Sequence, residues 1–178
     1  MKNFFTTKRI CRAGVIAALY AVITWVLGPY AYGPLQFRPA EALCILPLFF
    51  PESVPALYIG CMLANLMSGY GVYDIFLGSV ATLLAAFLTY GTGRLIKNHV
   101  LRVIVGGFFP IIINAFLIPL VWILAGSEIA YWYEFGVMIL NEALWIYALG
   151  IPLYFGLVGL RNKGVSVFID AKKKPDEQ

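Results

Sequence analysis

The side chains with the clearest chemical potential are three acids that stand within strongly apolar stretches, Glu41, Asp74 and Glu142. An ionised carboxylate deep in a membrane costs about 2.5–3.5 kcal/mol, so it needs a partner or a function. Trp145 follows Glu142 by three residues, and on a helix the two side chains are neighbours. A carboxylate beside an indole can hold an ammonium group, or a flat heterocycle that stacks on the ring and donates N–H groups to the acid.

Amides and aromatic residues accompany the acids along the chain. Glu142 is the strongest candidate, because its own helix carries no basic neighbour. Trp132 lies in a Tyr-Trp-Tyr run that could instead anchor the chain at the membrane interface. The candidate ligand-binding residues are Glu142, Glu41, Asp74, Asn141, Asn65, Trp145, Gln36, Phe37, Arg38, Tyr70 and Trp132.

Structural roles compete with ligand binding at several of these positions. Asp74 opens an expected helix and could cap its free N–H groups. Glu41 follows Arg38 by three residues and could form an ion pair with it. Asn65 and Asn114 could bridge neighbouring helices. The sequence leaves these alternatives open.

The composition shows which solvent surrounds these residues. Apolar residues make up 61% of the 178 residues, charged residues 12%, and the mean hydropathy is +0.84. A soluble domain carries about 25% charged residues, so most of this chain must face lipid. Cys11, Cys44 and Cys61 have spacings that predict neither a metal site nor a disulfide framework. We expect one transmembrane domain over residues 1–178.

The apolar segments predict an all-α membrane protein of about six transmembrane helices. A helix needs roughly 20 apolar residues to cross a bilayer. The second and third segments are short, and could instead form one re-entrant hairpin. The expected helices are Ile10–Gly28, Ala40–Phe50, Ser53–Met67, Asp74–Ile96, Val100–Ala125 and Phe135–Leu160.

The basic residues predict the orientation of these helices. With six spans and a cytoplasmic N-terminus, 12 of the 13 Lys and Arg residues fall on the inner side, and Arg38 alone lies outside. Both termini are then cytoplasmic, with a basic tail over residues 164–178. This distribution fits contact with anionic lipid headgroups and argues against nucleic acid as a partner.

The same layout brings the polar residues to one level of the membrane. Glu41 lies near the outer end of its helix, Asp74 opens a helix at the outer face, and Glu142 lies on a helix that enters from outside. No acid falls in the inner half of a span. We therefore expect a pocket that opens to the exterior and holds a small ligand.

Other motifs define a docking stripe and argue against catalysis. Ala13, Ala17 and Ala21 recur every four residues, a spacing that lets another helix approach closely, either within the chain or from a partner. No P-loop motif is present, and His99, the one histidine, falls in an inner loop away from every acid. We expect that the chain is not an enzyme.

Three sequence blocks carry a family resemblance. They are QFRPAEAL at residues 36–43, IGCMLANL at 59–66 and YDIFLGSVATL at 73–83. The blocks resemble the QueT family of queuosine-precursor transporters, which are substrate-binding S components of energy-coupling factor (ECF) importers. The likeness covers nearly the whole chain. Ala13 and Ala17 are similar to the Ala-x-x-x-Ala motif by which S components dock onto a partner, and Ala21 extends the repeat.

The resemblance implies an S-component-like bundle that binds a 7-deazaguanine such as preQ1 near the outer face. A transmembrane T subunit and two ATPase subunits would use ATP to drive uptake, and this chain would need no cofactor of its own. Alternatives are an S component for another heteroaromatic vitamin, a self-sufficient proton-coupled carrier with Glu142 as the proton site, and a structural subunit without a ligand.

Overall fold

The computed structural model describes residues 6–32 and 36–165, which form helices and connecting turns without any strand. The expectation for the basic tail concerns residues that lie almost entirely outside this range. The helices are α1 (Thr7–Leu27), α2 (Pro29–Tyr32), η1 (Pro39–Leu48), α3 (Ser53–Asn65), α4 (Gly71–Tyr73), η2 (Asp74–Gly78), α5 (Ser79–Leu95), α6 (His99–Leu124), α7 (Tyr131–Ala148) and α8 (Gly150–Asn162).

Four helical stretches in the described residues are long and apolar enough to cross a membrane. They are Thr7–Leu27, Gly71–Leu95, His99–Leu124 and Tyr131–Asn162. Helix η1 and helix α3 have only 10 and 13 residues. At rises of about 2.0 and 1.5 Å per residue, each reaches only about 20 Å. The expected helices at Ala40–Phe50 and Ser53–Met67 therefore exist, but they are shorter than full spans.

Helix η1 is the centre of the bundle. It packs against α1, α3, α5, α6, α7 and α8, and nearly all of its side chains are buried. Pro39 at its first turn and Pro47 within it each lack a backbone donor, and the backbone winds as a tight 3-10 helix. Such an irregular segment is tolerated at membrane depth only where protein surrounds it. The long helices provide that enclosure.

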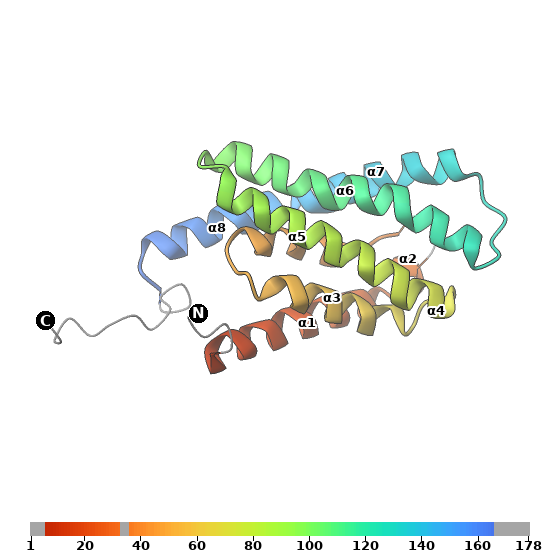
Figure 1. Cartoon of the computed structure of the whole chain (residues 1–178), viewed down its shortest axis with the longest axis horizontal. Helices are drawn as coiled ribbons and strands as arrows, with labels where there is room; N and C mark the ends of the chain where they lie inside the picture. Colours follow the sequence, from red (N-terminus) through yellow and green to blue (C-terminus); the bar gives the residue numbers. More distant parts are fainter. Residues whose placement is uncertain (1–5, 33–35, 166–178) are drawn as a thin grey trace, which may run out of the picture.

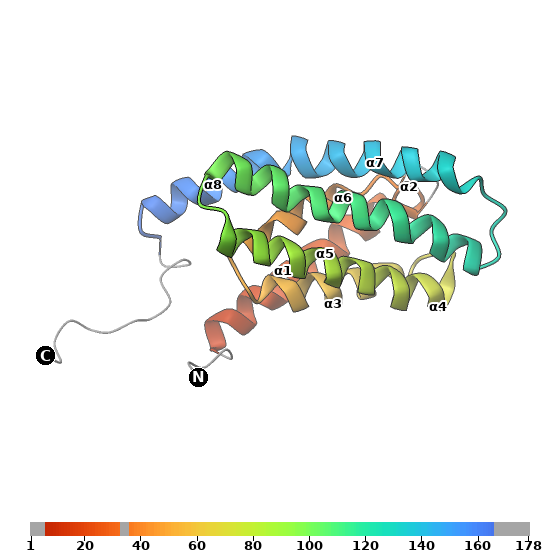
Figure 2. The same cartoon turned by 45° about the horizontal axis from the view of Figure 1, so that its top comes forward.

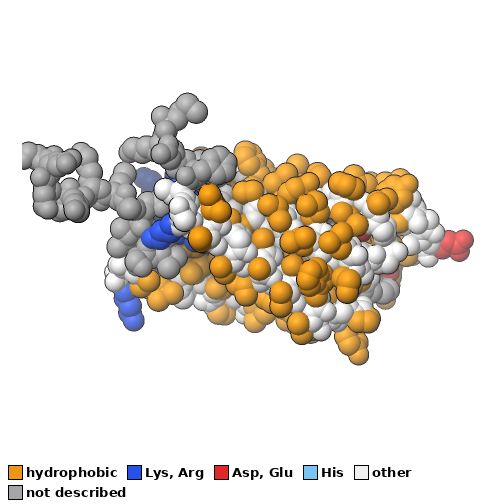
Figure 3. All heavy atoms as spheres, turned by 90° about the horizontal axis from the view of Figure 1, so that it is seen from below, with side chains coloured by type: hydrophobic (Ala, Val, Ile, Leu, Met, Phe, Trp, Pro, Cys, Tyr) orange, Lys and Arg blue, Asp and Glu red, His pale blue; other side chains and the backbone are white. Residues whose placement is uncertain are grey.

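The long helices lie side by side around η1. Helix α1 packs on α3, α5 packs on α6, and α6 packs on α7 (Figures 1 and 2). The start of α1 and the end of α8 lie at the same end of the molecule. Lys and Arg side chains gather at that end, which we call the basic end, and the visible acidic side chains at the opposite, acidic end (Figure 3). A broad band of hydrophobic side chains lies between the two ends.

Proline shapes two of the long helices. Pro110 has no N–H to donate to the carbonyl of Gly106, and the Thr89 hydroxyl donates to that oxygen instead, at 2.8 Å. Helix α6 therefore stays continuous through Pro110. The expected helix Phe135–Leu160 is instead divided at Leu149 into α7 and α8, because Pro152 cannot donate to Ala148.

The alanine stripe on α1 lies largely inside the protein. Ala17 and Ala21 are buried. A Cβ built on Gly60 of α3 would lie 2.9 Å from the Ala17 carbonyl oxygen, so the two backbones are in close contact. Ala17 and Ala21 therefore serve the α1–α3 contact, and Ala13 packs against the same core. Docking of this stripe onto a partner stays a prediction.

We predict that Gly60→Ala destabilises the protein. The added methyl group meets the backbone of Ala17, which cannot move without shifting α1, so the expected loss is about 1–3 kcal/mol. Thermal unfolding in detergent measures it. Gly14→Ala is the matched control on α1, because a Cβ there meets nothing within 4 Å. Equal melting temperatures for the two variants would contradict the close packing.

Candidate functional site

Arg38 lies at the centre of a buried polar cluster near the acidic end. It precedes η1, and only 4% of its surface is exposed. Its Nε donates to the Ala31 carbonyl oxygen at 2.8 Å, and its Nη2 donates to Asn65 Oδ1 at 3.3 Å. Nη2 also lies 3.9 Å from Asp74 Oδ2. Arg38 thus connects the loop before η1 to α3 and η2.

Asp74 lies inside a helical segment and does not cap its start. Helix α4 begins at Gly71, and the chain continues through η2, a turn with wider i→i+5 hydrogen bonding. The Asp74 carboxylate accepts a hydrogen bond from the Ser68 hydroxyl at 2.6 Å. Asn65 Nδ2 donates to the Asp74 main-chain oxygen at 2.9 Å. The capping alternative for Asp74 is therefore wrong, and Asn65 does bridge two elements.

Glu41 points into the core from the first turns of η1. Its carboxylate accepts hydrogen bonds from the hydroxyl of Tyr20 on α1 and from Cys44 Sγ, the latter at 3.1 Å. Among the described residues, the ion pair of Arg38 is with Asp74 and not with Glu41. The alternative in which Glu41 pairs with Arg38 is therefore wrong. Tyr20 supplies the hydrogen bond instead.

Glu142 completes the cluster from α7. It is buried, and its Oε1 accepts a hydrogen bond from Asn114 Nδ2 on α6 at 3.0 Å. Asn114 therefore bridges two helices, as one reading of the sequence held. Glu41 and Arg38 lie near enough to Glu142 for their charges to act on it. Four elements, the loop before η1, η1 itself, η2 and α7, thus deliver charged groups to one region.

The charges of this cluster do not balance. Glu41, Asp74 and Glu142 are all buried, and within the described part of the chain Arg38 is the cation that faces them. Ionised carboxylates in a low-dielectric interior repel one another and lose their hydration. Neutrality therefore requires protons on the acids or a cationic guest. The cluster is built to accept positive charge.

Several buried polar atoms of the cluster have no hydrogen-bond partner among the residues that the structure describes. The acceptors are Glu142 Oε2, Asn114 Oδ1 and Asp74 Oδ1, and the donors are Trp145 Nε1 and Gln36 Nε2. Buried polar groups normally find hydrogen bonds, and an unmet one costs about 1–3 kcal/mol. A ligand with both N–H donors and a carbonyl acceptor would satisfy this set.

Phe37 and Gln36 link the aromatic side of the site to the loop before η1. The rings of Phe37 and Trp145 meet edge to face, with centroids 4.4 Å apart. Gln36 is buried and has a φ of 43°, the one positive φ of a non-glycine residue in the described chain. Such a conformation costs about 1–3 kcal/mol and is frequent at ligand sites. The loop therefore holds Gln36 and Phe37 against the cluster.

The side-chain contacts described for three predicted residues lie outside the cluster, although the main-chain N–H of Tyr70 donates to Ser68 Oγ at 3.2 Å. Asn141 Nδ2 donates to the Val137 carbonyl oxygen of its own helix at 3.2 Å. Trp132 is 73% exposed and contacts Tyr131 and Phe135, as an interface anchor does. Tyr70 stacks on Trp122, with centroids 5.0 Å apart. Burial, then the charges of Asp74 and Glu134, raise the pKa of the Tyr70 hydroxyl, so it stays protonated.

Sequence reasoning missed several participants, chiefly Tyr20, Cys44 and Ser68. Tyr20 is fully buried, and it lies on the α1 face marked by Ala13 and Ala17. That helical phase is the signal that could have found it. Cys44 follows Glu41 by three residues, but its thiol could not be distinguished from an ordinary core side chain. Within residues 6–32 and 36–165, no group of three His, Cys, Asp or Glu side chains could hold a metal ion.

The fold and the polar residues together define a multi-pass membrane protein with a buried, acid-rich cluster. Residues 10–158 match the QueT transporter family, and the chain belongs to that family. A curated relative is the "Queuosine precursor transporter QueT" of Lactococcus lactis subsp. cremoris (strain MG1363), which is 37% identical over 87 residues. The match covers 48% of this chain and about half, 50%, of the relative. No solved structure matches the chain.

We predict that Arg38→Gln destabilises the protein by about 3–5 kcal/mol, because it leaves the buried carboxylates without their cation. Adding Asp74→Asn should restore part of that loss, since it removes one of the unpaired charges. Denaturant unfolding of the wild type, both single variants and the double variant gives the free energies of unfolding for a double-mutant cycle. Strictly additive losses would show that Arg38 and Asp74 do not interact.

Proposed function

We propose that this protein is the substrate-binding subunit of an importer for a queuosine precursor, a 7-deazaguanine such as preQ1. The observation that carries the proposal is the buried cluster with three carboxylates, one arginine and unpartnered donors and acceptors. The name of the Lactococcus relative, a queuosine precursor transporter, supports the choice of substrate. Family membership supports transport as the activity.

The chemistry of a 7-deazaguanine fits the unpartnered groups. Its ring N–H and amino group are donors for carboxylate and amide oxygens such as Glu142 Oε2 and Asn114 Oδ1. Its carbonyl oxygen is an acceptor for donors such as Trp145 Nε1 or Gln36 Nε2. The aminomethyl group of preQ1 is a cation, which the surplus of carboxylates favours. The ring is flat and suits the aromatic pair of Phe37 and Trp145.

We predict that Glu142→Gln weakens the binding of preQ1 by at least about tenfold, because the charge-assisted hydrogen bond is worth roughly 1.5–3 kcal/mol. Isothermal titration calorimetry on the purified protein measures the change in Kd. Glu128→Gln is the matched control, because Glu128 is an exposed acid in the turn between α6 and α7, at the end of the molecule opposite the N-terminus (Figure 1). Unchanged affinity of Glu142→Gln would remove Glu142 from the site.

Mass spectrometry of small molecules that copurify with the protein tests the identity of the ligand. A deazaguanine is the expected finding. An unrelated heteroaromatic vitamin would keep the class of protein and replace the ligand. The absence of binding by any deazapurine or vitamin would favour a structural subunit.

The proposed energy source is an ECF complex, in which a T subunit and two ATPase subunits act on this chain. The sequence lacks a P-loop, so ATP would be used by the partners. The second candidate is a proton-coupled carrier, which is favoured by the proximity of two buried acids, Glu41 and Glu142. In that case a proton on Glu142 would balance the cluster.

We predict that the purified protein alone in liposomes binds preQ1 but does not accumulate it against a gradient. An imposed pH gradient should make no difference, because no step of the proposed cycle is coupled to protons. Uptake of radiolabelled preQ1 measures this, and Glu142→Gln provides the background. Accumulation driven by the pH gradient would establish the carrier and exclude the need for ATPase partners.

A further inference from the structure

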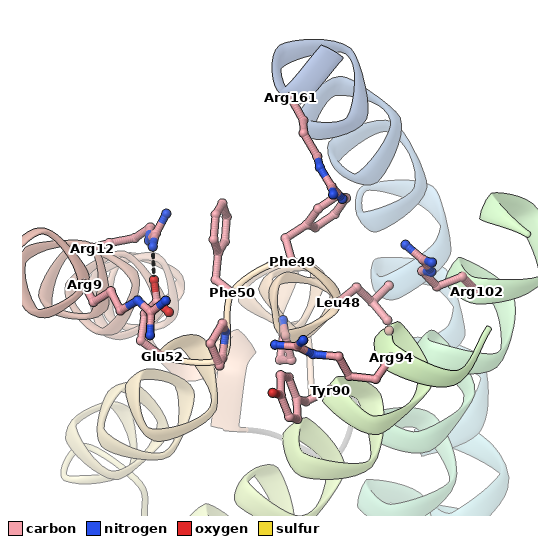
Figure 4. A pocket seen from close by; sticks show the side chains of 13 residues that line it. Arg9, Arg12, Leu48, Phe49, Phe50, Glu52, Tyr90, Arg94, Arg102 and Arg161 are labelled. Carbon is pink, nitrogen blue, oxygen red and sulfur yellow. Dashed lines mark ion pairs between the residues drawn. The ribbon is translucent and has the colours of Figure 1, made fainter. Parts of the chain in front are cut away.

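A recess at the basic end is separate from the acidic cluster. Its volume is about 310 Å³, and Figure 4 shows its lining. The floor is the end of η1 and the turn that follows, residues 47–52. Four helices, α1, α5, α6 and α8, supply its basic side chains, which are Arg9, Arg12, Arg94, Arg102 and Arg161.

The described lining of the recess contains arginine and no lysine. Every arginine of the chain except Arg38 lines this recess, whereas none of the three lysines that the structure describes, Lys8, Lys97 and Lys163, does. Arginine and lysine satisfy the positive-inside rule equally well, so this rule does not explain why arginine and not lysine lines the recess. Arginine differs in its planar fork of donors, which binds two oxygens of a phosphate at once. The arrangement therefore points to an oxyanion.

Local contacts hold the guanidinium groups in place. Arg12 forms an ion pair with Glu52 and lies over the ring of Phe50, 4.1 Å from its centroid. Arg94 lies over the ring of Tyr90 at 5.1 Å. Stacking and ion pairing of this kind reduce the entropy lost when a ligand is bound.

Two further arginines add to the positive charge of the recess. Arg102 Nε donates to the Ile96 carbonyl oxygen at 2.7 Å. Arg161 extends from the end of α8 toward Phe49 (Figure 4). Among the described lining residues Glu52 is the one acid, so these five arginines and one glutamate sum to +4.

Lipid-facing residues surround the arginines at this end. Leu95 directly follows Arg94 and is 83% exposed, and Val100 and Leu101 next to Arg102 are also exposed. Exposed leucine and valine beside arginine indicate the depth at which acyl chains meet headgroups. A phosphate at this depth belongs to a lipid more naturally than to a dissolved metabolite.

We propose that the arginine-lined recess binds the phosphate of an anionic phospholipid such as phosphatidylglycerol. The forked guanidinium groups hold the phosphate oxygens, and the acyl chains lie along the adjacent apolar surface. Native mass spectrometry of the full chain, released from nanodiscs of phosphatidylglycerol and phosphatidylcholine, tests this. One retained phosphatidylglycerol is the expected result. Equal retention of phosphatidylcholine would overturn the proposal, and this comparison needs no variant.

Paired substitutions separate the recess from general surface charge. Arg94→Gln with Arg161→Gln should weaken phosphatidylglycerol retention about tenfold, because two charge-assisted contacts are lost. The matched control is Lys97→Gln with Lys163→Gln, which removes the same charge from exposed positions two or three residues away. Retention should stay within about twofold of the wild type for that control. An equal loss of phosphatidylglycerol retention in both double variants would show that only the overall surface charge matters, and it would overturn the proposed lipid site.

Competition distinguishes the source of the phosphate. Inorganic phosphate at millimolar concentration should leave the lipid in place, because it lacks the acyl chains. Displacement by inorganic phosphate would overturn the lipid assignment in favour of a soluble anion. Displacement by a polyglutamate peptide at micromolar concentration would overturn it in favour of an acidic protein segment.

Discussion

The structure depends on one constraint: carboxylates inside a low-dielectric bundle must be compensated. Three of them, Glu41, Asp74 and Glu142, gather around the single buried arginine near the acidic end. Tyr20, Ser68 and Asn114 each donate a hydrogen bond to one carboxylate. These donors stabilise the acids without cancelling their charge. The remaining deficit of positive charge is the reason we propose this cluster as the binding site.

The fold places a short irregular helix where this compensation is needed. Helix η1 carries Glu41 and follows directly after Arg38, and its backbone is enclosed by longer helices on every side. An irregular segment of this kind would be unstable if it faced lipid, because its unpaired carbonyl groups would lack hydrogen-bond partners. A carbonyl group is also left without its helical partner at Gly106, because Pro110 has no N–H to donate. The Thr89 hydroxyl donates a hydrogen bond to this oxygen instead. Polar groups inside the bundle thus serve the backbone as well as the site.

The two ends of the molecule have opposite chemistry. The acidic cluster lies near one end and suits a cationic or N–H-rich guest, whereas five arginines line a recess at the other. The turn after η1 forms the floor of that recess, while the residues before η1 carry Arg38. The central helix η1 therefore runs between the acidic cluster and the recess. A shift of η1 at either end would disturb its packing against all of the neighbouring helices.

The sequence by itself determined that this is a membrane protein, and it identified which charged residues would be buried. Hydropathy predicted the long helices, because about 20 apolar residues are needed to cross a bilayer. The cost of burying a charge selected Glu41, Asp74 and Glu142. Only the tertiary structure decided their partners. Arg38 reaches Asp74 across 36 residues and not Glu41 three residues away, because Arg38 lies in the non-helical backbone before η1 and shares no helical turn with Glu41. Likewise Ala17 faces Gly60, and Asn141 turns to its own helix. Local spacing determines which residues share a helical face, but the packing of distant elements determines what that face meets.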